Sequence, residues 1–301
     1  MASLYTQKGA NIRRTWLLMT SFFILVILTG YFISWYMNTP GVLWIAVAFS
    51  IMMNITAYWF SDKIALAAAG AKAADEREYR ELHRVVENLA ITAGLPKPRV
   101  FVIDDPAPNA FAAGRGPKHA VVAVTRGLLQ RLERSELEGV IAHELSHIGN
   151  RDILVMTVAV VLAGFIAIIS DIFLRMSFFG GGDRRENRNP IMLIAGIVAI
   201  VIAPIAAQLI QFAISRKREF LADASGALLT RYPEGLASAL QKIASYGAPM
   251  RRANHATAHL FISNPFCAHE AGSASWRIIA KIFSTHPPIE ERVAALTQMR
   301  I

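Results

Sequence analysis

Four long apolar runs alternate with polar, charged segments along the chain. They extend over Trp16–Met37, Gly41–Phe60, Ile153–Phe173 and Ile191–Ile214. Each run is near or above the roughly 20 residues that a helix needs to cross a hydrocarbon layer of about 30 Å. The pattern therefore predicts four transmembrane helices in two hairpins, with the first hairpin turning at Asn38–Gly41.

Charged residues at the ends of the runs predict the topology. Basic residues before the first run favour a cytoplasmic N-terminus, and the chain then returns to the cytoplasm after the second run. The same scheme places Arg184, Arg185 and Arg188 outside, against the positive-inside bias. Two interpretations therefore stay open: the last two runs cross with an exceptional loop, or they enter the membrane without crossing it.

The segments between the apolar runs have the mixed pattern of a soluble domain. A helical period over Asp75–Gly94 ends at a glycine that prolines follow. Short apolar stretches separated by Pro and Gly turns predict strands at Arg99–Ile103, Asn109–Gly114 and His119–Thr125. Two further helices are expected, one starting at Pro233 and one within His286–Met299.

These patterns divide the chain into four parts. They are an N-terminal transmembrane hairpin (1–60), a first soluble part (61–152), a second hairpin (153–214) and a second soluble part (215–301).

The segment HELSH has the spacing of a metal-binding helix. Ser135 and Glu138 form a capping-box pattern that predicts the start of this helix. His143 and His147 then lie on one helix face, one turn apart, where both imidazoles can bind one zinc ion at about 2.0–2.1 Å. Glu144 would act as general base for the attacking water.

A catalytic zinc site needs a third protein ligand and an open position. No third histidine follows the HELSH segment, so the ligand must come from elsewhere. We expect Glu219, with Asp223 one turn later accepting the ring N–H of a ligating histidine. The alternative is a solvated Glu–Arg–Asp helix face. Because a second hairpin returns the chain to the same side of the membrane, both halves of a one-zinc site would meet just above the bilayer.

Composition supports a membrane protein and narrows the partners. Hydrophobic residues make up 54% of the chain and charged residues 18%, which fits a chain partly solvated by lipid. The net charge of +9 lies mostly beside the apolar runs, as expected for anionic lipid headgroups rather than nucleic acid. The single cysteine, Cys267, excludes an internal disulfide and a cysteine-built zinc site.

Five segments carry a family resemblance. They are PNAFAAG (Pro108–Gly114), VVAVTRGLL (Val121–Leu129), ELEGVIAHELSHIGNRD (Glu136–Asp152), SRKREFLAD (Ser215–Asp223) and STHPPIEERVAAL (Ser284–Leu296). In these segments, their order and their spacing, the sequence resembles the HtpX-type membrane zinc metallopeptidases, relatives of the CAAX prenyl endopeptidases.

The resemblance implies an α+β, mainly α, membrane protein whose cytoplasmic gluzincin-type protease domain is split by the second hairpin. It implies zinc held by His143, His147 and Glu219, with Glu144 as base and Asp223 beside the ligands. It also implies a zinc endopeptidase of the bacterial inner membrane that degrades misfolded or damaged membrane proteins in envelope and heat-shock stress. Other membrane quality-control proteases are further expected partners.

Other histidines and one asparagine have weaker assignments. Asn109 and His286 could contact the scissile carbonyl or stabilise the tetrahedral intermediate. The alternatives are a strand-end residue and a helix-start residue. His255, His259 and His269 are interpreted as surface or hydrogen-bonded histidines, although one of them could shield the open metal position.

The predicted strand at Asn109–Gly114 suggests how substrate binds, because an extended peptide could add to its edge. Two rival functions stay open. A membrane scaffold with a structural zinc would need ligands but no base such as Glu144. A prenyl-dependent CAAX-type protease would need a large chamber enclosed by membrane helices, and four spans are too few to enclose one.

Overall fold

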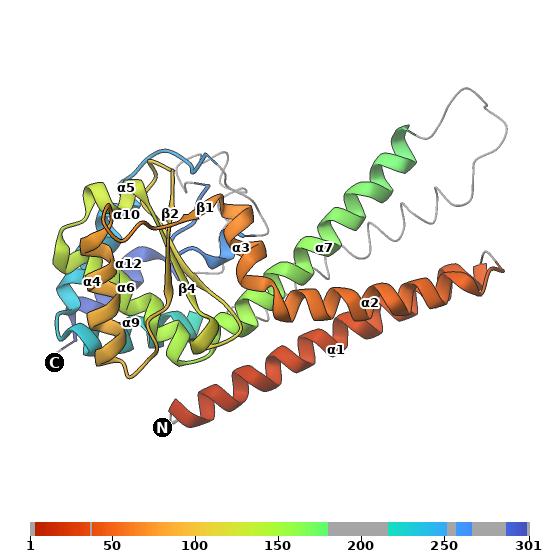
Figure 1. Cartoon of the computed structure of the whole chain (residues 1–301), viewed down its shortest axis with the longest axis horizontal. Helices are drawn as coiled ribbons and strands as arrows, with labels where there is room; N and C mark the ends of the chain where they lie inside the picture. Colours follow the sequence, from red (N-terminus) through yellow and green to blue (C-terminus); the bar gives the residue numbers. More distant parts are fainter. Residues whose placement is uncertain (1–3, 37, 180–215, 252–256, 267–286, 300–301) are drawn as a thin grey trace.

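The computed structural model describes residues 4–36, 38–179, 216–251, 257–266 and 287–299 (Figure 1). In chain order, its elements are α1 (Leu4–Tyr36), α2 (Gly41–Trp59), α3 (Ser61–Ala69), β1 (Ala71–Ala73), α4 (Arg80–Thr92), β2 (Arg99–Ile103), β3 (Ala110–Ala113), η1 (Pro117–His119), β4 (Val121–Thr125), α5 (Arg126–Arg131), α6 (Arg134–Gly149), α7 (Asp152–Phe179), α9 (Arg216–Thr230), α10 (Pro233–Ala244), η2 (Ala258–Leu260) and α12 (Ile289–Thr297).

A four-stranded mixed sheet in the order β1-β2-β4-β3 lies at the centre of the domain. Strands β2 and β4 pair in parallel, with Arg99 opposite Val121, and β3 pairs antiparallel to β4. The sheet confirms the three predicted strands, with β3 and β4 slightly shorter than the sequence pattern. Strand β3 lies at a sheet edge, as predicted.

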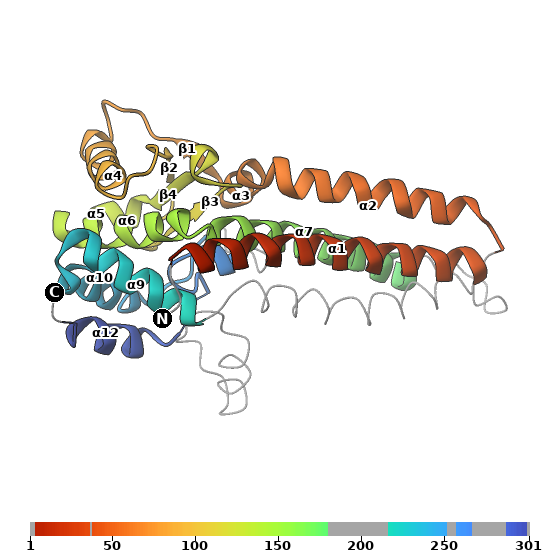
Figure 2. The same cartoon turned by 90° about the horizontal axis from the view of Figure 1, so that it is seen from below.

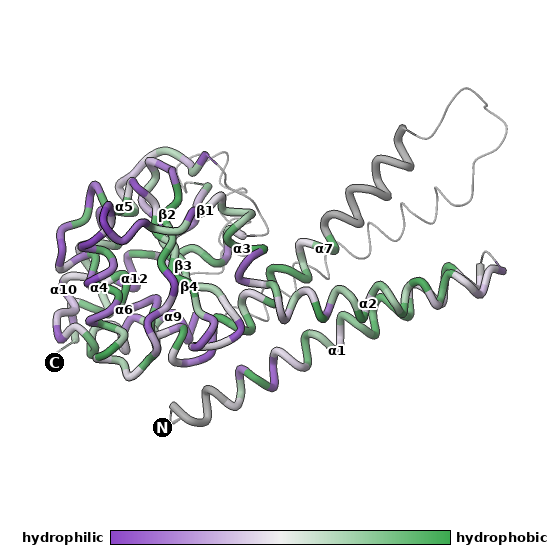
Figure 3. Tube along the Cα trace, in the orientation of Figure 1, coloured by the Kyte–Doolittle hydropathy of each residue, from purple (hydrophilic) through white to green (hydrophobic). Residues whose placement is uncertain are grey.

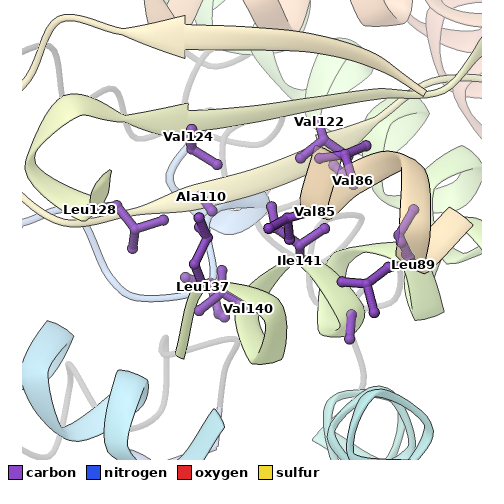
Figure 4. Close-up of a cluster of buried hydrophobic side chains, with 14 of the residues drawn as sticks. Val85, Val86, Leu89, Ala110, Val122, Val124, Leu128, Leu137, Val140 and Ile141 are labelled. Atoms are coloured by element: carbon purple, nitrogen blue, oxygen red, sulfur yellow. The ribbon is translucent and has the colours of Figure 1, made fainter. Parts of the chain in front are cut away.

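The main core lies between the sheet and the helices that cover it. In the close-up, apolar side chains from α4, β3, β4, α5 and α6 converge, among them Val85, Val122, Val124 and Ile141 (Figure 4). Helix α6 is nearly enclosed, because most of its side chains from Leu137 onward are buried. This burial holds the HELSH segment rigidly inside the domain.

Helices α1 and α2 form an apolar hairpin that projects from the domain (Figure 2, Figure 3). Among the described residues, Gly9–Trp35 and Gly41–Trp59 are long and apolar enough to cross a membrane. Gly30 faces Ala46, where an added Cβ would lie only 2.2 Å from the Ala46 Cβ. Such small residues let membrane helices approach closely.

Helix α7 contains the third apolar run but does not continue α6 in a straight line. The two helices meet at 84°, and Arg151 at the break has a positive φ of 62°. Taken together, α6 and the first half of α7 are long and apolar enough to be a third, bent candidate for a membrane span. Side chains from Ile153 to Ala163 are mostly buried against the protein. The fourth run, Ile191–Ile214, lies outside the described residues.

Three local predictions need correction. The capping box that opens α6 is formed by Glu133 and Glu136, two residues earlier than predicted, and the backbone N–H of Glu133 donates to Glu136 at 2.8 Å. Helix α1 begins at Leu4 rather than Trp16, because no proline interrupts the polar residues before the apolar run. Helix α4 begins at Arg80 rather than Asp75. The side-chain oxygen of Asp75 instead accepts hydrogen bonds from the backbone N–H groups of Arg77 and Glu78 in a turn before the helix.

Candidate metal centre

Two helices bring three ligand-type side chains together inside the domain. His143 and His147 come from α6 and Glu219 from α9, and one potential ligand atom of each lies within 4.8 Å of the other two. The two imidazole Nε2 atoms are 3.1 Å apart, and Glu219 carboxylate oxygens lie 3.5 Å from the His147 Nε2 and 3.9 Å from the His143 Nε2. All three side chains are buried.

The approach of α9 to α6 depends on a glycine. An added Cβ on Gly226 would lie 2.9 Å from the backbone nitrogen of His143. Any larger residue would therefore push the two helices apart and separate Glu219 from the histidines. Gly226 thus sets the distance between the two halves of the centre.

The Nδ1 atom of His143 is held by the buried ion pair between Asp223 and Arg292. This Nδ1 lies 2.9 Å from Asp223 Oδ1. Arg292 on α12 donates to both oxygens of Asp223, at 2.7 and 2.8 Å. Burial lowers the pKa of His143 to about 4, although Asp223 opposes this shift. The imidazole is therefore neutral at pH 7 and presents its Nε2 to the centre.

His147 has a corresponding carboxylate partner at the start of α7. Its Nδ1 lies 3.2 Å from Asp152 Oδ2. Burial lowers the pKa of His147, but the hydrogen bond to Asp152 and the charge of Glu219 outweigh burial and raise it to about 9. Both histidines thus have their Nδ1 atoms fixed and their Nε2 atoms facing each other.

Glu144 follows the first of these histidines and lies beneath the edge strand. Burial raises the pKa of its carboxyl to about 7, against the charges of His147 and Arg292 and a hydrogen bond to the backbone of Ala112 in β3. A pKa near neutrality lets a carboxyl both accept and release a proton at physiological pH. The environment therefore suits acid–base chemistry beside the three ligand-type side chains.

Asn109 lies just before β3, outside this group. Its amide nitrogen donates to the Ser263 carbonyl at 2.9 Å, and its side-chain oxygen accepts from the Ser263 backbone N–H at 3.3 Å. The preceding residue of that segment, Ile262, donates its N–H to the Ala110 carbonyl. Asn109 therefore holds a segment of the chain against the edge of the sheet.

The remaining predicted histidines are placed only in part. His259 lies half-buried in η2 and does not join the metal group among the described residues. His255, His269, His286 and Cys267 lie outside the residues that the structure describes.

Two residues close to the centre have no assigned role in the sequence analysis. Nothing in the sequence indicated that Asp152 would contact a ligand, apart from its place five residues after His147. Arg292 did carry a signal: it shares a helical face with Ile289 and Leu296, which are apolar, and a charge on such a face indicates a buried partner.

Comparison with known proteins agrees with this geometry. Residues 76–300 match the sequence profile described as Peptidase family M48. The chain belongs to peptidase family M48. It is therefore a metalloprotease, and its apolar helices attach it to a membrane.

Relatives of this M48 protease match it over nearly its whole length. It is 48% identical to the "Protease HtpX homolog" of Caldanaerobacter subterraneus, over 99% of both chains. It is 49% identical to the "Protease HtpX homolog" of Pyrococcus furiosus, over 95% of both chains. These matches confirm the family resemblance drawn from the five motifs.

A solved structure shares the fold. The crystal structure of S. mikatae Ste24p superposes with a TM-score of 0.51 at 18% identity, covering 92% of this chain and 67% of that one. At this identity the likeness concerns the fold alone, and it agrees with a mainly helical α+β architecture.

Proposed function

We propose that this M48 protease is a zinc-dependent endopeptidase whose ligands are His143, His147 and Glu219 and whose general base is Glu144. The observation that carries the proposal is the convergence of three buried ligand atoms within 4.8 Å of one another. A buried carboxyl with a pKa near 7 beside them supports a hydrolytic rather than a purely structural centre.

The residues present fit a zinc ion. Two ligands of a tetrahedral zinc at about 2.0–2.1 Å would be separated by about 3.3 Å. The distances of 3.1 and 3.5 Å from the Nε2 of His147 to its two neighbours are close to that separation. When bound, zinc supplies a Lewis acid that polarises a peptide carbonyl and makes water more acidic.

The protein's own groups provide the proton transfers. Glu144 takes a proton from the attacking water and later delivers it to the leaving amine. Asp223 and Asp152 hold the two imidazoles in fixed orientations through their Nδ1 atoms. The helices that bear these residues are packed in the core, so the groups require little reorganisation during the reaction.

We further propose that the peptide substrate adds to the outer edge of β3. This edge lies beside Glu144, whose carboxyl forms a hydrogen bond with the backbone of Ala112. The Ala110 carbonyl already accepts from Ile262, so substrate would pair beyond that point or displace this segment. Binding through backbone atoms tolerates many sequences, which suits a protease of misfolded proteins. A substrate-analogue complex without strand pairing at β3 would contradict this part.

The membrane arrangement is proposed as four spans, with residues 153–214 forming a second hairpin that interrupts a protease domain built from 61–152 and 215–301. Packing of α6 against α9 supports this division, because it unites the two soluble parts. We place the protein in a bacterial inner membrane with the active site facing the cytoplasm. The proposed substrates are misfolded or damaged membrane proteins in envelope and heat-shock stress, where other membrane quality-control proteases would act alongside it.

Chelation should abolish cleavage by the full-length protein purified in detergent. Fluorescent unfolded casein is the substrate, and peptide release is followed after removal of zinc and after its return. We expect activity to disappear with the chelator and to reappear with about one zinc per chain. A His143→Ala variant, tested in parallel, should stay inactive at the same zinc concentration. Cleavage that persists without metal would contradict the proposal.

Zinc binding should release about one proton at pH 7. Zinc needs a neutral imidazole, whereas the pKa of about 9 leaves His147 protonated in the metal-free centre at this pH. The apparent zinc affinity should therefore fall about tenfold for each pH unit below 9. Calorimetry in buffers of different ionisation enthalpy measures the released protons, and Glu144→Gln removes any contribution from that carboxyl. An affinity independent of pH between 7 and 9 would show that His147 is already neutral.

A further inference from the structure

A polar side chain of the first membrane helix reaches the surroundings of the metal centre. Asn11 lies near the start of α1, within the candidate span Gly9–Trp35, and is 1% exposed. Its amide nitrogen donates to Asp152 Oδ1 at 2.7 Å and to the Asn150 carbonyl at 3.0 Å. Its side-chain oxygen accepts from Arg218 Nη1 at 3.2 Å. Both amide hydrogens and the oxygen are therefore engaged at once.

Asp152 connects this asparagine to a proposed ligand. One carboxylate oxygen faces Asn11, and the other faces the Nδ1 of His147 at 3.2 Å. The carboxylate is 1% exposed, so no bulk water competes for its lone pairs. The orientation of the His147 ring thus depends on how firmly Asp152 itself is held.

Arg218 supplies the charge that balances Asp152. Its Nε lies 3.8 Å from Asp152 Oδ1, and its side chain is buried one residue before the proposed ligand Glu219. The guanidinium therefore contacts both the carboxylate and the oxygen of Asn11. Three segments of the chain, α1, the start of α7 and α9, meet in this small buried network.

The two histidines are supported in different ways. The partner of His143, Asp223, is fixed by Arg292 from within the soluble domain. The partner of His147 is fixed instead by a residue of a helix that crosses the membrane. A change in the position of α1 would therefore alter the surroundings of His147 directly, but not those of His143.

We propose that Asn11 is a positioning residue for the metal centre, acting through Asp152 to orient His147, so that the first membrane helix is part of the catalytic unit. The inference rests on the proposed function for the identity of the ligands. Residues that support a metal ligand from behind typically contribute 10–100-fold to metal affinity. A merely structural role, which joins α1 to the domain, would change stability and leave the affinity for zinc unaltered.

The test measures zinc affinity of the full chain in detergent by competition with a chromogenic chelator. Asn11→Leu removes both donors and the acceptor, and we expect zinc affinity to fall about tenfold. Asn11→Asp keeps the size and the contact with Arg218 but loses the amide donors, so it should weaken zinc binding at least as much. This second variant serves if the first fails to fold. The visible absorption of the Co²⁺-loaded protein should also change, because it reports ligand geometry.

Thr15→Val is the matched control. Thr15 is buried four residues further along α1. Within the described part of the chain its hydroxyl donates only to the Asn11 carbonyl of the same helix. We expect its zinc affinity and Co²⁺ spectrum to match the wild type within about twofold. Unchanged affinity in a folded Asn11 variant, or an equal loss in Thr15→Val, would overturn the inference. Because zinc binding is measured without cleavage, a wild-type protein that binds zinc yet fails to cleave would contradict the proposed function alone.

Discussion

Replacing Glu144 by Gln should abolish peptide cleavage while one zinc ion remains bound. The amide has nearly the same shape but cannot accept a proton from the attacking water, and general acid–base catalysis contributes about 10²- to 10⁴-fold. We therefore expect the rate of casein cleavage to fall by at least about a hundredfold. Zinc content, measured by mass spectrometry on the same sample, should match the wild type.

Glu138→Gln provides the matched control for this loss. Glu138 lies on the same helix and pairs with Arg134 at 3.0 Å near the surface. The same chemical change there should leave both cleavage and zinc content unaltered. Equal cleavage by wild type and Glu144→Gln would show that Glu144 is not the base. Zinc binding without cleavage in either protein would favour the scaffold interpretation.

Replacing Arg292 by Met should lower the free energy of unfolding by about 3–5 kcal/mol. Arg292 and Asp223 are a fully buried pair joined by two hydrogen bonds. Methionine fills much of the volume but leaves the Asp223 charge without a partner in a dry interior. The change also removes a donor to the Ile262 carbonyl. Urea unfolding in detergent, followed by circular dichroism, measures the difference.

An exposed ion pair shows what burial adds. Lys97 and Glu87 lie 3.0 Å apart with side chains 35% and 51% exposed. Lys97→Met should change the free energy of unfolding by about 1 kcal/mol or less, because water and salt screen such pairs. If Arg292→Met is as mild as Lys97→Met, the Arg292–Asp223 pair does not hold the centre together.

Local patterns were sufficient to predict three of the four strands and the first membrane hairpin, but not the short β1. The apolar character of Arg99–Ile103 and the length of the apolar runs are local properties of the chain, so the structure follows them closely. The spacing of His143 and His147 is likewise a property of one helix. Placing Glu219 beside them needed an argument about the path of the chain through the membrane.

Asp223, the partner of His143, was predicted from its place one turn after Glu219. Three other residues that support the ligands could not be predicted in this way. Asn11 and Asp152 are 141 positions apart, and no periodicity links them. Gly226 matters only because another helix passes over it. The early start of α6 also depended on context, because two possible capping boxes, Glu133 with Glu136 and Ser135 with Glu138, overlap in the sequence. Such features depend on tertiary packing, which local patterns in a single sequence do not reveal.

The most direct test of the account is anomalous diffraction at the zinc edge from crystals of the zinc-loaded full-length protein. We expect a single peak within about 2.0–2.2 Å of His143 Nε2, His147 Nε2 and a Glu219 oxygen, with a fourth position open to water. That arrangement would fit a hydrolytic centre next to Glu144. A zinc ion held elsewhere, or one closed by a fourth protein ligand, would contradict the central claim.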